Sequence, residues 1–292
     1  MQYLLQNKHL RAVIKEKGAE VVSLQRNGEE YLWNADARYW GRTSPVLFPI
    51  VGLLKNGQYR HEGKTYTMGQ HGFARDMVFS VTQKSDTQIA MQITDTEETY
   101  EKYPFHFRLT IRYRLEEETL RVIWMVENTD DKQMYFSIGA HPGFFCPHNG
   151  QGTQSEYFIR FTKHGKAVER VESSLFGTIG LSEEKQVYHM QDGILPIDAH
   201  LFDREALILE NNQVQEISLL NPKKEPYVTV AFDTPLVGIW SPPKKEAPFV
   251  CIEPWYGRCD KESFDGEFAQ REWTNSLNPG EIFEGSYTIS VY

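Results

Sequence analysis

The feature that most constrains the fold is the strict alternation of apolar and polar residues in segment 107–115, FRLTIRYRL. Its odd-numbered residues are all apolar, and its even-numbered residues are all polar. A period of two places successive side chains on opposite faces of a β-strand. The sequence therefore predicts a strand with one solvated face. A second apolar segment, 120–128, follows the turn EEET and predicts a hairpin. Ile123 and Met125 are apolar as well, so we expect this second strand to be buried on both sides.

Similar short segments recur along the chain and are separated by turn signals such as RNGE, HEGK and NTDD. They lie at 19–33, 57–68, 76–95, 206–220, 226–232 and 286–292. Long helical periodicity is missing, and only 35–40 (ADARYW) and 264–273 (FDGEFAQREW) predict short helices.

Many strands joined by tight turns predict an all-β protein with antiparallel sheets, arranged as a sandwich or a barrel. We see no internal repeat and no low-complexity linker in the 292 residues. The lysine- and proline-rich segment 241–248 predicts an exposed loop and not a domain boundary. We therefore expect a single domain over residues 1–292, a length that large β domains reach.

The charge of the chain argues against two classes of partner. Its formal net charge is −9 and it has no long basic run, whereas nucleic acids and anionic membranes are bound by basic surfaces. The start of the chain lacks the pattern of a signal peptide, and no apolar run is long enough to span a bilayer. Cys146, Cys251 and Cys259 are odd in number and form no regular disulfide framework. We therefore expect a soluble, cytoplasmic protein.

Segment 70–76, QHGFARD, is the first candidate for chemistry. His71 and Arg75 lie four residues apart, and Gly72 permits a turn between them. One interpretation is a surface loop whose histidine caps a carbonyl, since isolated His and Arg usually have structural roles. The other is a pair that contacts a ligand.

Segment 137–147, SIGAHPGFFCP, is the second candidate. Pro142 restricts the preceding His141 to extended conformations, and Gly139 and Gly143 permit sharp turns around it. Phe144 offers an apolar wall, and lowered access to water depresses an imidazole pKa. His141 is then either a packed structural histidine or a proton donor at a ligand pocket.

Segment 249–260, FVCIEPWYGRCD, is the third candidate. If 249–253 is a strand, Cys251 and Glu253 share one face, and Pro254 ends the strand directly after the glutamate. A carboxylate beside Trp255 costs free energy unless it has partners. The alternatives are a buried structural ion pair and a functional carboxylate.

The three segments support one hypothesis, in which a histidine acid and a carboxylate base act on a small substrate. Aromatic faces suit sugars, and Trp240, Trp255 and Phe144 lie near these segments. The chain has no HExxH or paired CxxC, and no GxGxxG, GxxxxGK[ST] or GxSxG. We therefore expect neither a metal nor a cofactor.

The ordered set SPVLFPIVG, QHGFARD, SIGAHPGF, GIWSPP and FVCIEPWYGRCD, from about Trp40 to Asp260, resembles the aldose 1-epimerase (galactose mutarotase) superfamily, and within it the LacX-like subgroup. The resemblance implies a large antiparallel β-supersandwich with a sugar cleft on one sheet. It also implies an isomerase that interconverts the α and β anomers of an aldose without a cofactor. The roles it implies for individual residues are His141 as general acid, Glu253 as general base, His71 as a sugar contact and Arg75 as a substrate-binding arginine.

The chain departs from the family pattern at two places. Leu53 stands where many relatives carry an arginine, which affects substrate preference. Asp203 is the best match for the substrate-binding aspartate, with Asp198 as an alternative, and Arg42 is a candidate for a replacement contact.

Two other functions remain open. One is a sugar-phosphate epimerase that uses Arg75, with Arg42 and Lys55 as helpers, and the other is a sugar-binding module without catalysis. The partner in each case is a small-molecule sugar, an aldohexose with or without a phosphate group.

Overall fold

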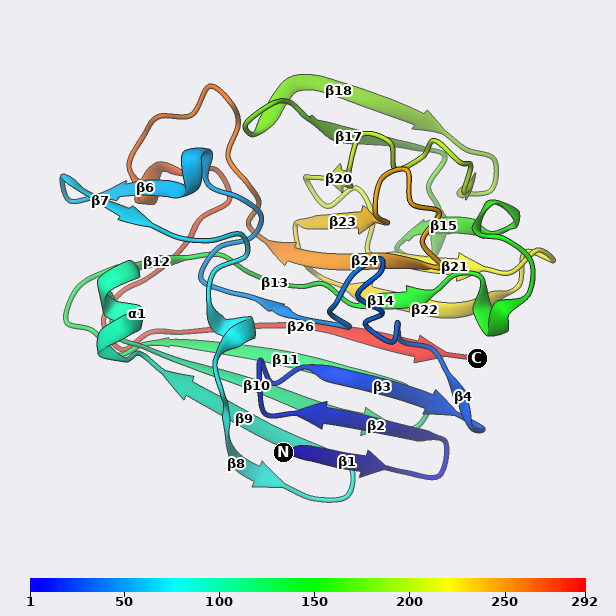
Figure 1. Ribbon diagram of the computed structural model, residues 1–292, viewed down its shortest axis with the longest axis horizontal. Helices are drawn as coiled ribbons and strands as arrows, with labels where there is room; N and C mark the ends of the chain where they lie inside the picture. Colours follow the sequence, from blue (N-terminus) through cyan, green and yellow to red (C-terminus); the bar gives the residue numbers. More distant parts are fainter.

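Two large antiparallel sheets dominate the computed structural model, which describes residues 1–292 (Figure 1). The larger sheet has ten strands in the order β16-β15-β21-β22-β26-β11-β10-β9-β8, with β19 paired to β15. Its strands are β8 (Ser80–Lys84), β9 (Gln88–Thr94), β10 (Phe107–Glu116), β11 (Thr119–Asn128), β15 (Phe158–Lys163), β16 (Lys166–Ala167), β19 (Ile194–Pro196), β21 (Glu216–Leu220), β22 (Pro226–Phe232) and β26 (Ile282–Val291).

The second sheet has eight strands in the order β18-β17-β20-β23-β24-β13-β5, and β14 pairs with β24 beside β13. Its strands are β5 (Val46–Leu47), β13 (Ile138–Ala140), β14 (Gly143–Phe145), β17 (Arg170–Phe176), β18 (Leu181–His189), β20 (Leu207–Leu209), β23 (Leu236–Trp240) and β24 (Phe249–Tyr256). All three segments that the sequence singled out border this sheet or form part of it.

Smaller elements surround the two sheets. A four-stranded sheet comprises β1 (Gln2–Gln6), β2 (Leu10–Lys15), β3 (Val21–Arg26) and β4 (Glu29–Glu30). Two further pairs are β6 (Gln58–His61) with β7 (Lys64–Thr67), and β12 (Met134–Phe136) with β25 (Asn275–Leu277). Single 3₁₀ turns lie at Lys55–Gly57, Ala74–Asp76, His148–Gly150, Gln154–Glu156 and Phe268–Gln270.

The helix predictions are wrong. Residues 35–40 form only a turn, and 264–273 contains only the 3₁₀ turn Phe268–Gln270. The one α-helix is α1 (Glu97–Lys102), which the sequence reading missed. It is short, and its start is fixed by a capping box in which Thr96 and Thr99 bond each other's backbone N–H groups. No helix in the structure reaches the length and apolarity that crossing a membrane requires.

The predicted hairpin is confirmed as β10 and β11, whose residues pair from Phe107–Asn128 to Glu116–Thr119. The odd-numbered residues of β10 are buried, as the alternation requires. The expectation of two buried faces on β11 is wrong, because Ile123 and Met125 are only half-buried. β11 is a central strand, hydrogen-bonded to β10 on one edge and to β26 on the other. A central strand can still have one face in the core and one face partly exposed to solvent.

The main core is a cluster of 63 buried residues between the two large sheets and under the four-stranded sheet. It contains Trp124 and Tyr287 from the ten-stranded sheet, and Val250 and Ile252 from β24. The fold is therefore a large antiparallel β-sandwich, as predicted. Because side chains alternate along β24, the odd-numbered residues 249–255 point to the opposite face of the eight-stranded sheet.

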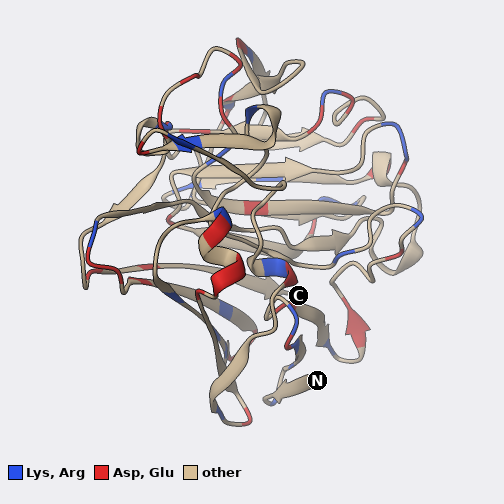
Figure 2. Ribbon diagram, turned by 60° about the vertical axis from the view of Figure 1, so that its left-hand side comes forward, with Lys and Arg blue, Asp and Glu red and all other residues tan.

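Charged residues lie mainly on the loops and on α1, with both signs interspersed (Figure 2). Lys244, Lys245 and Glu246 are exposed on the loop between β23 and β24, as the lysine- and proline-rich segment predicted.

Candidate active site

The strand register brings His141 and Glu253 together. Gly139 of β13 pairs with Trp255 of β24, and Gly143 of β14 pairs with Cys251. In this register His141, midway between the two glycines, lies directly across from Glu253. Facing residues of an antiparallel pair are immediate neighbours. The Nε2 atom of His141 is accordingly 3.2 Å from Oε2 of Glu253.

The prediction that Pro254 ends the strand is wrong, because β24 continues to Tyr256. The backbone N–H of Ile252 donates to the carbonyl of Pro142, so the nitrogen of Pro254 faces the same neighbouring chain. The ladder on that side is interrupted between Gly139 and Gly143. A proline is tolerated there because no hydrogen bond is lost.

The glycines around His141 make room for indole rings and do not provide sharp turns. Neither Gly139 nor Gly143 has a positive φ. A Cβ atom on Gly139 would lie 2.6 Å from Cδ1 of Trp255, and one on Gly143 would lie 3.3 Å from Cζ3 of Trp40. The missing side chains therefore allow the two tryptophans to lie close to the strands that carry the histidine.

The pair is buried with unused hydrogen-bonding capacity. His141 is 7% exposed and Glu253 is 1% exposed. Nδ1 of His141 and Nε1 of Trp255 are buried without a hydrogen-bond partner, and Oε2 of Glu253 has only its contact with His141. Such groups are rare in folded proteins, because each loses its bonds to water on burial. Their clustering at one place is the arrangement expected of a polar ligand site.

Burial shifts both titrations of the pair toward the neutral forms. Desolvation raises the pKa of Glu253 well above its usual 4.5. Desolvation also lowers the pKa of His141 from 6.5 to about 3, and the positive charges of Arg75 and Arg42 act in the same direction. A carboxylic acid beside a neutral imidazole holds one proton, as does a carboxylate beside an imidazolium. The site therefore keeps one proton that either partner can carry.

The raised pKa of Glu253 predicts that the stability difference between the wild type and Glu253→Gln depends on pH. A buried carboxyl with a raised pKa keeps its proton in the folded state, while the unfolded chain loses it above about pH 4.5. The wild type should therefore lose about 1.4 kcal/mol of stability per pH unit that the variant does not lose. Thermal melts from about pH 5 to pH 8 should show the Tm advantage of the variant growing with pH. A constant difference would contradict the raised pKa.

His71 is the third member of the site and is held as a neutral donor. Its ring centroid is 5.5 Å from that of His141, at an interplanar angle of 87°. The backbone N–H of Gly52 donates to Nδ1 of His71 over 3.0 Å, so the ring proton sits on Nε2. Desolvation lowers its pKa well below 6.5. A Cβ on Gly72 would lie 2.2 Å from the carbonyl oxygen of Phe48, so the adjacent position requires glycine.

A group of cations lies beside the histidines. Nη2 of Arg42 is 3.1 Å from Asp76, while Nε of Arg75 and Nζ of Lys17 each lie 3.9 Å from the same carboxylate. Nη2 of Arg75 donates to the carbonyl of Gln70, and its Nε is buried without a hydrogen-bond partner. Desolvation and the nearby Arg42 lower the pKa of Arg75 to about 10. Three cations share one carboxylate, which leaves a surplus of positive charge.

The structure brings some of the predicted site residues together and leaves others apart. Trp240 meets the His141 ring edge-on at 5.5 Å, and Trp255 lies over Gly139. Phe144 is fully buried in the main core, because side chains alternate along β14 and Phe144 points to the opposite face from Phe145. Asp203 is bonded to His200.

Asp203 and Asp198 line a separate cavity of about 840 Å³ with residues of the 241–248 loop, and His71, His141 and Glu253 are not among its lining residues.

Cys251 lies on the same face as Glu253 and, with His141, completes the one group whose donor atoms are close enough for a shared cation, all within 4.8 Å. Burial raises the pKa of the Cys251 thiol well above 9.0. Thiolate, imidazole and carboxylate are all zinc ligands, and a cation bound here would have to displace the thiol proton.

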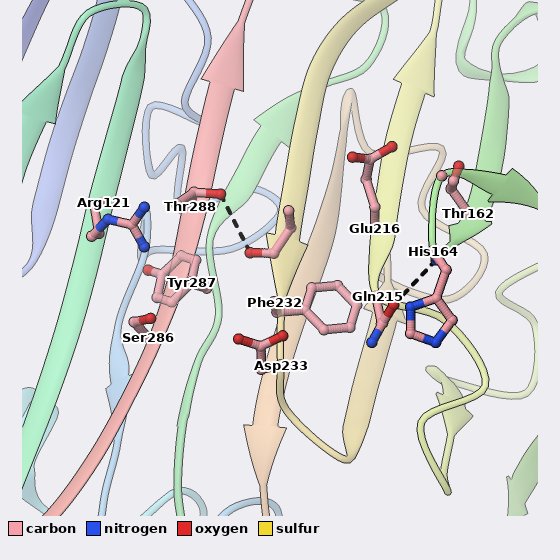
Figure 3. A pocket seen from close by; sticks show the side chains of 12 residues that line it. Arg121, Thr162, His164, Gln215, Glu216, Phe232, Asp233, Ser286, Tyr287 and Thr288 are labelled. Atoms are coloured by element: carbon pink, nitrogen blue, oxygen red, sulfur yellow. Dashed lines mark hydrogen bonds between the residues drawn. The ribbon is translucent and has the colours of Figure 1, made fainter.

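A polar hollow of about 490 Å³ lies on the outer face of the ten-stranded sheet, apart from the pair of His141 and Glu253. It is lined by Arg121, His164, Glu216, Asp233 and Thr288, among others (Figure 3). It contains no buried histidine–carboxylate contact, so we do not assign the chemistry to it.

Sequence reasoning missed Trp40, whose ring is stacked on His141 at 4.7 Å. The tryptophan falls in the segment that was expected to be helical, and nothing in its local pattern indicates a long-range contact.

The fold and this pair define a protein of the galactose mutarotase-like class. A sequence model described as Aldose 1-epimerase matches residues 1–290, and the chain belongs to that family. "Protein LacX, chromosomal" of Lactococcus lactis is 28% identical over 98% of each chain. A galactose mutarotase related enzyme from Lactobacillus acidophilus is 34% identical, with a TM-score of 0.93 over 100% of this chain and 97% of that one. A galactose mutarotase-like protein from Lactobacillus casei is 30% identical, with a TM-score of 0.91 over the full length of both chains.

Proposed function

We propose that the protein is an aldose 1-epimerase that interconverts the α and β anomers of a hexose. The observation that carries this proposal is the buried contact between His141 and Glu253, 3.2 Å apart on facing strand positions with hydrogen-bonding capacity left unused. Membership of the aldose 1-epimerase family supports a sugar substrate.

The proposed reaction needs one base and one acid. Glu253, as carboxylate, takes the proton from the C1 hydroxyl, and His141, as imidazolium, donates a proton to the ring oxygen. The bond between C1 and the ring oxygen breaks and leaves an open-chain aldehyde. Rotation about C1–C2 presents the other face of the carbonyl, and the reverse proton transfers close the ring. The two reacting oxygens are attached to the same carbon, so an acid and a base in contact with each other can reach both.

The proton count of the site matches this cycle. Ring opening converts carboxylate and imidazolium into carboxylic acid and neutral imidazole, and ring closure restores the charges. Burial favours the neutral form, which is the form that accompanies the open-chain aldehyde. Hydroxyl groups of a bound pyranose would stabilise the charged form by donating to Glu253 and accepting from His141. His71 would donate from Nε2 to a sugar oxygen near the ring oxygen.

Polarimetry on freshly dissolved α-glucose and α-galactose tests the proposal. The expected result is a decay to the anomeric equilibrium that is faster than in buffer and proportional to protein concentration. Sugar binding without any rate increase would favour a non-catalytic carbohydrate-binding protein. The acid–base pair argues against that function, since binding alone requires no buried proton donor.

A second candidate, a hexose-6-phosphate 1-epimerase, is favoured by the cations beside the histidines. Arg42 and Arg75 lie close enough to His71 and His141 to depress both imidazole pKa values, so an anionic group held by them would lie next to the sugar ring. Arginine is the preferred side chain for forked hydrogen bonds to phosphate.

Arg42→Met tests this second candidate. If the arginine holds a phosphate, kcat/KM for glucose 6-phosphate should fall by about tenfold or more, because a hydrogen bond to a charged group is lost. The value for glucose should not fall, because Arg42 disfavours the imidazolium form of His141. Arg38→Met is the matched control, because Arg38 is exposed, is paired with Asp36 and is not among the charges that lower the pKa of His71 or His141. Equal losses on both sugars, or a wild type that prefers unphosphorylated glucose, would contradict the assignment.

A further inference from the structure

Four aromatic rings form a continuous stack that ends on His141. Trp33 and Phe249 lie 4.5 Å apart at 22°, Phe249 and Trp40 lie 5.7 Å apart at 18°, and Trp40 and His141 lie 4.7 Å apart at 28°. We call these four rings the aromatic column. They come from the loop before β5, from β24 and from the junction of β13 and β14.

The column is anchored at the end away from the histidine. Trp33 is 2% exposed, and its Nε1 donates to the carbonyl of Trp40 over 2.9 Å. Gly143 lies against both tryptophans, since a Cβ there would be 3.2 Å from Cβ of Trp33 and 3.3 Å from Cζ3 of the Trp40 indole. Trp40 is therefore tied to the column by its backbone as well as by its ring.

The column constrains the His141 ring without blocking its nitrogens. Trp40 covers one face of the imidazole, and Trp240 and His71 meet the ring at 83° and 87°. Proton transfer to and from an imidazole takes place in the plane of the ring. A stacked neighbour thus fixes the plane that holds both ring nitrogens, Nε2 next to Glu253 and Nδ1 without a hydrogen-bond partner.

The indole face also acts on the charge of His141. The groups that face this ring are the Glu253 carboxyl, the neutral His71, the Cys251 thiol on β24, and the more distant guanidinium groups of Arg42 and Arg75. Both arginines disfavour an imidazolium, as does burial. The face of a tryptophan carries negative potential and attracts a cation. Trp40 therefore acts with Glu253 to favour the charged form that donates the proton.

We propose that Trp40 is a positioning residue for the general acid: its stacked indole fixes the plane of the His141 ring and stabilises the imidazolium during the reaction. This inference rests on the proposed mutarotase activity. It assigns to Trp40 a role in kcat, which differs from that of an aromatic platform that binds the sugar.

The test compares Trp40→Phe and Trp40→Leu, because phenylalanine keeps an aromatic face and leucine does not. We expect kcat to decrease in the order Trp, Phe, Leu, with a total loss of about threefold to thirtyfold and an unchanged KM. The control is Tyr39→Leu, which alters the adjacent ring of the same loop, since Tyr39 contacts Trp33 edge-on and is not stacked on His141. This variant should keep the wild-type kcat.

Two results would overturn the assignment. A rise in KM with an unchanged kcat would make Trp40 a sugar platform, and equal kcat values for Phe and Leu would show that the aromatic face is irrelevant. The stack itself is tested without sugar by NMR, because the indole ring current should shift the His141 Hε1 signal upfield in the wild type and not in Trp40→Leu. A wild type inactive on every aldose would refute the proposed function and this role with it. An active wild type with an unaffected Trp40→Leu variant would refute this role alone.

Discussion

Glu253→Gln is expected to lower catalysed mutarotation by about 10²–10⁴-fold while the protein remains folded. The amide has the shape of the carboxyl group but accepts no proton, so the C1 hydroxyl loses its base. The fold should tolerate the change, because Gln carries no charge and the buried Glu253 is already driven toward its neutral form by desolvation. Initial rates of optical rotation, corrected for the rate in buffer, give the loss directly.

The matched control for this change is Glu216→Gln. Glu216 lies on the outer face of the ten-stranded sheet, in the hollow of Figure 3. Its substitution is the same chemical change, made far from His141. It should retain the wild-type rate. Full activity in Glu253→Gln would show that the base has been assigned to the wrong residue, and loss of a cooperative melt would show that the variant tests stability and not chemistry.

His141→Asn is expected to cause a loss of similar size, because it removes the proton donor to the ring oxygen. The double variant with Glu253→Gln should be little slower than either single variant, since acid and base act in one proton relay and their effects are not additive. Rates for the two single variants and the double variant complete the cycle. Additive losses would mean that the two residues act independently.

The control for the second change is His164→Asn, an exposed histidine in the same outer hollow. Wild-type activity is expected for it. Retained activity in His141→Asn would leave His71 as the alternative acid. The bond from Gly52 to Nδ1 argues against that alternative, because it holds His71 in a neutral form.

Local pattern was sufficient to predict the class of fold. The alternation in 107–115 fixed which face of β10 is buried, and the hairpin with β11 followed from the turn between them. Local pattern did not predict that 35–40 and 264–273 are not α-helical. Their sequences contain helix-forming residues, but 35–40 is held by long-range contacts of Trp40, and helix propensity is a weak prior against tertiary packing.

The candidate pair was predictable as two residues but not as a contact. Nothing local relates His141 to Glu253, and their meeting depends on the register of β24 against β13 and β14. The same reasoning explains why Phe144 is not at the site. It is close to His141 in the sequence, but the alternation of side chains along β14 points it into the core. The position of Asp203 depends on the long segment between β19 and β20, where no alternation is available to fix a direction.

The location of the proposed acid and base on facing segments of one sheet has a consequence for regulation. Enzymes whose reacting groups belong to separate lobes can be switched off by moving the lobes apart, as in hinge closure. Here a shift of one residue would turn a side chain to the other face, and smaller displacements are resisted by backbone bonds on both sides. For the proposed mutarotase, an effector would therefore have to act on the entry of the sugar, while His141 and Glu253 stay in contact.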